Sequence, residues 1–169
     1  ANGDPATNNP YMYAYGEINT YRKDNLFGRA ELEWSLSSPL KLLVRSGMDY
    51  NGDNYEYKLS KGFTNVNQRN GRYSIQTEST YFMNSDVMLN WNKDFKKIST
   101  TAVIGYNYIY SNSYNSNSNA DQLVRANDFS LGNAVAGSLT ANNLWGTGKN
   151  QSAYASTQIR IVTFTLPQH

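Results

Sequence analysis

Few side chains in this sequence have types and spacings that could support catalysis. Glu31 and Glu33 lie two residues apart, and paired carboxylates are what glycosidases use for acid–base chemistry. Arg29 follows the same alternation, so the pattern favours charge balance on a polar strand face over hydrolysis. The single histidine is the last residue, His169, which excludes a serine or cysteine triad built on histidine. The sequence therefore predicts a protein that is not an enzyme.

Metal and cofactor sites also find little support. Asp53 and its neighbouring asparagines resemble the start of a calcium loop, but the glycine and terminal glutamate of that motif are missing, which favours a polar turn. The chain has no cysteine, so it holds neither a disulfide framework nor a thiolate metal site. Gly28, Gly47 and Gly105 are expected within strands, where glycine indicates bends or close packing rather than phosphate binding. We expect no metal and no cofactor.

The composition is unusual for a soluble domain. Only 17% of the 169 residues are charged, against roughly 25% in ordinary globular proteins, and 14 are tyrosines. The net charge of +2 is scattered without a basic stripe, so nucleic acid is not an expected partner. The mean hydropathy is −0.66. This polar average is compatible with a membrane β-barrel, whose strands show lipid only at every second residue.

Hydropathy alternates with a period of two, which indicates β-strands. Between Leu26 and Leu36, one parity carries Leu32 and Trp34, and the other carries Arg29 and two glutamates. The expected fold is all-β, an antiparallel meander of about five long strands. Their predicted ranges are 26–36, 40–50, 73–93, 98–110 and 153–166.

The predicted connections alternate in length. Short turns are expected at Pro39 and Lys96, and long outer loops at about 51–72 and 111–151. Transmembrane barrels place short turns on the periplasmic side and long loops outside, with aromatic belts at both interfaces. The aromatic belt residues predicted here are Trp34, Trp91, Tyr50, Tyr106, Tyr108 and Tyr110. A soluble antiparallel sheet with one solvent-exposed face shows the same alternation, so a soluble β-protein remains an alternative.

Several segments together resemble the barrel strands of SusC/RagA-type, TonB-linked outer-membrane transporters. The resemblance covers about Asn9 to Gln158 and consists of diffuse strand patterns. Its segments are Asn9-Pro10-Tyr11, Leu40-Lys41-Leu42 through Arg45, Gly47 and Asp49-Tyr50, Asn84 to Lys93, and Gly105-Tyr106-Asn107.

This resemblance implies a parent barrel of about 22 strands with an N-terminal plug. It implies a location in the bacterial outer membrane, energy from TonB, a SusD-type surface lipoprotein as partner, and glycans or peptides as cargo. This chain would supply part of the barrel wall and no plug domain. The residues expected to face the lumen or plug, and to bind there, are Arg29, Glu31, Glu33, Arg45, Asp49, Asp86 and Asn90.

Five strands are too few to close a barrel, which needs about eight. We therefore expect the chain alone to be inactive in transport. It should self-associate through its strand edges or lipid face, or rearrange into a small soluble β-structure. Two other functions stay open: a self-standing outer-membrane barrel of about eight strands, and a soluble extracellular β-sandwich that binds carbohydrate.

The C-terminal residues depart from the resemblance. After Ile159 the family pattern would continue with Gly-Tyr-Arg-Asn and an aromatic strand, whereas residues 160–169 read differently. One permissible codon choice for these residues, read in the neighbouring frame, gives Tyr-Arg-Asn-Phe-Tyr-Leu-Thr-Ala-Thr. A frameshift in the gene is therefore a hypothesis for this segment.

Overall fold

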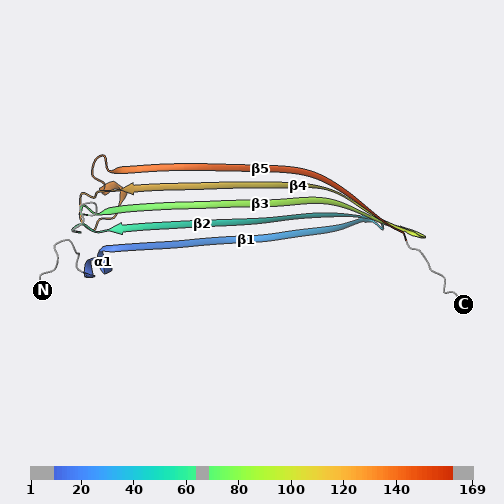
Figure 1. Cartoon of the computed structure of the whole chain (residues 1–169), viewed down its shortest axis with the longest axis horizontal. Helices are drawn as coiled ribbons and strands as arrows, with labels where there is room; N and C mark the ends of the chain where they lie inside the picture. Colours follow the sequence, from blue (N-terminus) through green and yellow to red (C-terminus); the bar gives the residue numbers. More distant parts are fainter. Residues whose placement is uncertain (1–9, 64–68, 162–169) are drawn as a thin grey trace. The chain divides into compact units, whose positions relative to one another are not determined.

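The computed structural model describes residues 10–63 and 69–161. These residues form one five-stranded sheet in which each strand lies beside its neighbour in the sequence (Figure 1). The predicted all-β antiparallel meander is confirmed. Its elements are helix α1 (Pro10–Gly16), strands β1 (Glu17–Ser37), β2 (Leu40–Leu59), β3 (Arg72–Phe95) and β4 (Ile98–Ala120), the 3-10 helix η1 (Leu131–Asn133), and strand β5 (Leu139–Ile161).

The strands are longer than the hydropathy pattern predicted. β1 begins at Glu17 rather than near Leu26, and β5 begins at Leu139 rather than near Ala153. The predicted outer loops 51–72 and 111–151 were therefore too long, because the connections cover only 60–71 and 121–138. Most of the added residues are polar on both parities, so hydropathy alternates weakly there although the backbone is paired. The end of β2 is the exception, because Tyr55, Tyr57 and Leu59 share one parity. The predicted end of the last strand, 162–166, lies outside the described residues.

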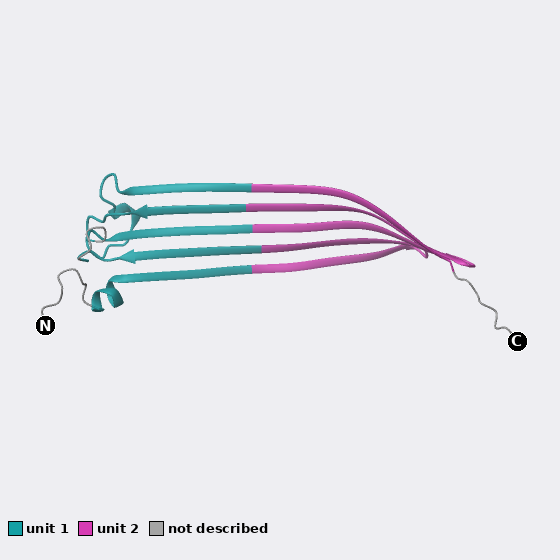
Figure 2. Ribbon diagram, in the orientation of Figure 1, with its two compact units in different colours: residues 1–25, 50–80, 113–146 teal, residues 26–49, 81–112, 147–169 magenta. Residues whose placement is uncertain are grey.

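The chain divides into two compact units, and every strand contributes a segment to each (Figure 2). Unit 1 comprises residues 1–25, 50–80 and 113–146, and unit 2 comprises residues 26–49, 81–112 and 147–169. The two long connections and α1 belong to unit 1. The two short turns, at 38–39 and 96–97, belong to unit 2. Within the second turn Lys96 has a φ of 43°, the left-handed conformation that such tight turns use.

Unit 1 has a small hydrophobic core. Tyr73 on β3 and Ala120 on β4 are buried with Leu123, and Phe129 and Leu131 from the connection between β4 and β5 pack against them. That connection therefore folds onto the sheet instead of extending into solvent. Burial of this apolar area is the main force that can hold a long connection in one conformation.

Asn133 fixes the conformation of the same connection. Its side chain is buried, and its amide nitrogen donates to the carbonyls of Arg125 at 2.9 Å and Asp128 at 2.7 Å. Its amide oxygen accepts a 3.0 Å hydrogen bond from the backbone nitrogen of Arg125. Three bonds from one buried amide replace the backbone pairing that a strand would supply.

Unit 2 has the opposite distribution of side chains. None of the buried hydrophobic residues of the described chain belongs to it, whereas the carboxylate residue Asp86 is only 8% exposed. Large apolar side chains are instead open to the surroundings, with exposures of 64% for Leu32, 62% for Trp34 and 63% for Ile104. A water-soluble sheet buries its apolar face. Unit 2 therefore exposes large apolar side chains while a carboxylate is shielded.

Candidate functional site

The polar groups of unit 2 converge around Asp86. We call the sheet face that carries Arg29, Arg45, Asn84, Asp86 and Asn107 the polar face. Alternation along each strand brings these side chains to one side: Arg29 from β1, Arg45 from β2, Asn84 and Asp86 from β3, and Asn107 from β4. Four neighbouring strands therefore contribute to one cluster.

Asp86 is held from both sides. The Nε of Arg45 donates to its Oδ2 at 2.8 Å, and Nδ2 of Asn107 donates to its Oδ1 at 2.8 Å. The same Asn107 nitrogen lies 2.6 Å from Oδ1 of Asn84. Hydrogen bonds to both oxygens compensate for the low exposure of the carboxylate, which would otherwise cost free energy to bury.

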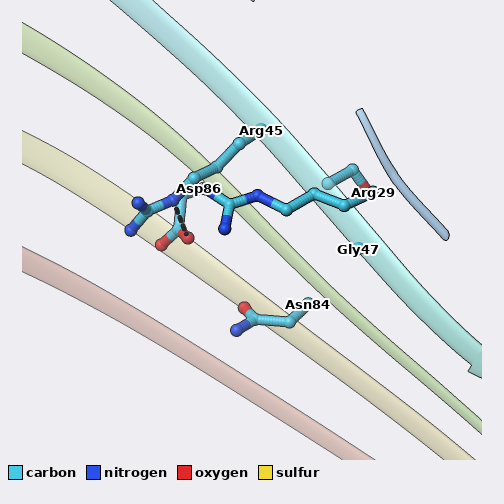
Figure 3. A pocket seen from close by; sticks show the side chains of 6 residues that line it. Arg29, Arg45, Gly47, Asn84 and Asp86 are labelled. Carbon is cyan, nitrogen blue, oxygen red and sulfur yellow. Dashed lines mark hydrogen bonds and ion pairs between the residues drawn. The ribbon is translucent and has the colours of Figure 1, made fainter. Parts of the chain in front are cut away.

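A shallow hollow of about 310 Å³ lies beside this network. It is lined by Arg29, Arg45, Gly47, Asn84 and Asp86, with Ser46 completing the wall. Figure 3 shows the side chains of Arg29 and Arg45 both reaching toward Asp86. Gly47 supplies no side chain, so the floor of the hollow there is backbone. The hollow can accept hydrogen-bonding groups, but it presents neither a nucleophile paired with a base nor an exposed carboxylate pair.

The remaining predicted lumen residues are distributed along the same strands. Glu31 pairs with Arg29 at 2.8 Å, and Glu33 pairs with Lys41 at 2.6 Å. Each glutamate of the pair considered for glycosidase chemistry thus has its own cation. Asp49 lines a second hollow of unit 2 together with Phe27 and Phe82, and Asn90 is half-buried on β3. The structure brings Arg29, Arg45 and Asp86 together and leaves Asn90 outside both hollows.

The predicted belt aromatics differ in their surroundings. Trp34 is exposed, whereas the ring of Trp91 packs against Phe95 with centroids 6.3 Å apart. Tyr110 lies 6.0 Å from the ring of Tyr81, and Tyr106 is 44% exposed. Tyr50 is exposed and Tyr108 is half-buried on β4. Trp145 of unit 1, which the prediction did not include, is 72% exposed and packs against Tyr114.

Sequence reasoning missed several residues of the polar clusters. Asn84 has the same parity as Asp86 on β3, a signal that was present but not decisive, whereas Asn107 lies on β4, which carries no charged residue. Asp53, interpreted as part of a polar turn, lies within β2 and accepts a 2.5 Å hydrogen bond from the hydroxyl of Tyr21. Asp53 has the same parity as Arg45 and Asp49, so extending the predicted strand past residue 50 would have placed it on the polar face.

Two classes of feature are missing from the described part of the chain. Residues 10–63 and 69–161 contain no group of three or more histidine, cysteine or acidic side chains placed to hold a metal ion. Neither helix in these ranges is long and apolar enough to cross a membrane.

Comparisons with known proteins give a structural likeness only. No protein-family model matches the chain, and no curated protein is detectably similar to it. Among solved structures, the chain is similar to one described as the RagAB peptide transporter, with a TM-score of 0.71 over 90% of this chain and 12% sequence identity. The chain spans 17% of the length of that protein. The described sheet therefore has the fold of one part of a much larger transporter chain.

Proposed function

We propose that this chain is a segment of the wall of a TonB-dependent outer-membrane importer of the SusC/RagA type. The observation that carries the proposal is the inverted distribution in unit 2, where a carboxylate residue is buried and leucine, isoleucine and tryptophan side chains are exposed. Such a sheet is stable where one face meets lipid and the other meets polar groups. The fold likeness to a transporter supports the same interpretation.

The apolar part of β1 has the length that a membrane crossing requires. Residues 26–36, at a rise of about 3.3 Å each, extend over roughly 36 Å. Tilted by about 45°, they would cross a band of roughly 25 Å, which is the height of the apolar belt of outer-membrane barrels. The polar strand segments of unit 1 would then lie in water.

The two alternative functions fit less well. A β-sandwich needs a second sheet, and every strand in the described residues belongs to one sheet. A closed barrel of about eight strands needs its first and last strands to pair, whereas β1 and β5 stand at opposite ends of the strand order. β5 is exposed at every position and β1 at every position after Glu17, as expected for edge strands that further strands would cover.

The proposal includes the role that the resemblance implies. The parent would import glycans or peptides, receive energy from TonB, and cooperate with a SusD-type surface lipoprotein. Arg29, Arg45, Asp86 and the remaining predicted lumen residues would contact the plug or the passing cargo. The chain would contribute binding and positioning rather than catalysis.

Alone, the chain should not transport. Its two open edges present unpaired backbone groups, which are costly in lipid and promote association. We expect oligomers of this chain in detergent, measured by sedimentation, and no pore conductance from isolated monomers. A stable monomer that conducts in vesicles would contradict the proposal.

Membrane contact is tested with single-tryptophan variants. The chain is folded into vesicles of phospholipids with brominated acyl chains. Bromine quenches the fluorescence of nearby tryptophans. A variant retaining Trp34 should be quenched strongly, whereas a variant retaining Trp145 should keep most of its emission. Equal quenching of the two, or no quenching of Trp34 in protein that has bound the vesicles, would refute a lipid-facing unit 2.

A further inference from the structure

Unit 1 contains a hollow whose chemistry differs from that of the polar face of unit 2. We call it the tyrosine hollow; it is lined by Tyr21, Asp53, Tyr55, Gln76 and Glu78 and has a volume of about 200 Å³. These residues come from β1, β2 and β3 and share one face by alternation. The hydroxyl of Tyr21 donates to Oδ1 of Asp53, so the aromatic and acidic walls are joined.

The two carboxylates of the tyrosine hollow are held by neutral donors. Oε1 of Glu78 accepts hydrogen bonds of 2.6 Å from both Gln76 and Asn115, and Asp53 accepts from Tyr21. Within the described residues neither carboxylate forms an ion pair. The other paired acids of unit 1 have cationic partners: Asp24 with Arg22, Glu56 with Lys58, Asp121 with Arg72, and Asp128 with Arg125. Two preorganised negative charges are thus left uncompensated in one hollow.

The negatively charged side chains of Asp53 and Glu78 shift the pKa of Tyr21. The hydrogen bond to Asp53 raises the pKa of Tyr21, and the charges of Asp53 and Glu78 raise it further. Tyr55, which lines the same hollow, donates its hydroxyl to Asn19 at 2.6 Å. Both tyrosine hydroxyls therefore act as donors to neighbouring strands, which fixes the orientation of the two rings.

A second, larger hollow adjoins the first at Glu78, which lines both. It has a volume of about 370 Å³ and includes Leu144, whose side chain is 60% exposed. Gly146 keeps it open, because a Cβ at this position would lie 2.6 Å from Oγ of Ser113. An apolar group can occupy this hollow beside whatever the carboxylates bind.

We propose that the tyrosine hollow binds a guanidinium or alkylammonium group, with an apolar group of the same ligand beside it over Leu144. Asp53 and Glu78 each have an oxygen that accepts no hydrogen bond in the described residues, Oδ2 and Oε2, and charge-assisted bonds to a cation would use both. The rings of Tyr21 and Tyr55 add cation–π attraction. This inference deepens the proposed function, since it names basic peptides as the cargo class that this wall would contact.

The probe is a blocked tetrapeptide, acetyl-Ala-Arg-Leu-Ala-amide, titrated calorimetrically into the full chain in neutral detergent micelles. Its matched analogue carries citrulline, which keeps the shape of arginine and removes the charge. We expect the citrulline peptide to bind on the order of tenfold more weakly, about 1.4 kcal/mol, because two charge pairs at exposed carboxylates are lost. Spermidine serves as a cation without a peptide backbone, and maltotriose as an uncharged sugar.

The variant pair tests the location of binding. D53N/E78Q should lose about as much affinity for the arginine peptide as the citrulline exchange does. The control D24N/E56Q removes the same charge from β1 and β2, at positions whose parity is opposite to that of Tyr21 and Asp53, and should retain affinity. Affinity of the unaltered chain should also fall as salt rises.

Equal binding of the two peptides, equal losses in the two double variants, or tighter binding of maltotriose would overturn the cation site. Tight binding of spermidine with weak binding of the peptide would overturn the assignment of peptide cargo. The quenching of Trp34 by brominated lipid reports on membrane contact independently, so failure of this site is distinguishable from failure of the proposed function.

Discussion

The guanidinium Nε of Arg45 on β2 lies 2.8 Å from Oδ2 of Asp86 on β3, and the Asp86 side chain is 12% exposed. The pair is the best-shielded ion pair of the described residues, because the acidic partners of the others are between 29% and 52% exposed. Low exposure limits screening by water and salt. This pair is therefore the one expected to matter most for the stability of unit 2.

Asp86→Ala should destabilise the folded chain by about 1–3 kcal/mol, because it leaves Arg45 and Asn107 without their shared acceptor. Urea unfolding in micelles, followed by tryptophan fluorescence, measures the loss. Asp24→Asn in the exposed Arg22–Asp24 pair is the control and should change stability by less than about 0.5 kcal/mol. Replacing both partners, as in R45M/D86L, should cost less than Asp86→Ala alone. Equal effects of D86A and D24N would contradict the assigned role.

Gly105→Val should disrupt the packing of Tyr154 in unit 2. A Cβ at residue 105 would overlap Cζ of the Tyr154 ring, so the ring must move. We expect a loss of about 1–3 kcal/mol in the free energy of unfolding. Adding Tyr154→Ala should recover part of that loss, because the valine side chain can then occupy the vacated space. If the second substitution only adds to the loss, the ring does not lie over Gly105.

Tyr73 predicts a specific loss of stability at alkaline pH. Burial raises its pKa to about 12, helped by the 2.7 Å hydrogen bond from its hydroxyl to Glu56. Since the folded pKa lies above the ordinary value of 10.0, the neutral form stabilises the fold below pH 10. That contribution is lost as the pH rises from 10 to about 12. Unfolding measured across this range should show a shallower decline in Tyr73→Phe than in the unaltered chain; parallel curves would refute the prediction.

Asn133→Ala should release the connection between β4 and β5. The side chain makes three hydrogen bonds, and loss of buried bonds of this kind costs about 1 kcal/mol each. Hydrogen exchange of the amides in 121–138 should accelerate strongly, while exchange in the strands of unit 2 stays unchanged. Ser130→Ala is the matched control on the same connection, since its side chain makes one exposed bond, to Asp128, and its backbone is extended. Similar acceleration in the two variants would remove the special role of Asn133.

The strand segments of unit 2 were predictable because their two faces differ in polarity. Leu32 and Trp34 alternate with Glu31 and Glu33, which is a sufficient signal for a strand without any partner. The extension of β1 from Glu17 was not predictable in this way. Ile18 is followed by polar residues of both parities, and only pairing with β2 makes this segment a strand.

The contacts of the candidate site were less predictable than the strands. Parity places Arg45 and Asp86 on one face, but the register between β2 and β3 decides that they meet. Register depends on the paired strand and on the turn between strands, and the long connection 60–71 gives no simple rule for it. The tyrosine hollow was missed for the same reason, because its five residues come from three strands.

In the proposed function, unit 2 presents one face to lipid and the other to a polar interior. The most direct measurement places a nitroxide, through single cysteines, at each position from 26 to 36 in vesicle-bound protein. We expect a period of two, with even positions such as Leu32 accessible to oxygen dissolved in lipid and odd positions such as Glu31 accessible to a water-soluble nickel complex. Uniform access of the nickel complex to both parities would contradict it.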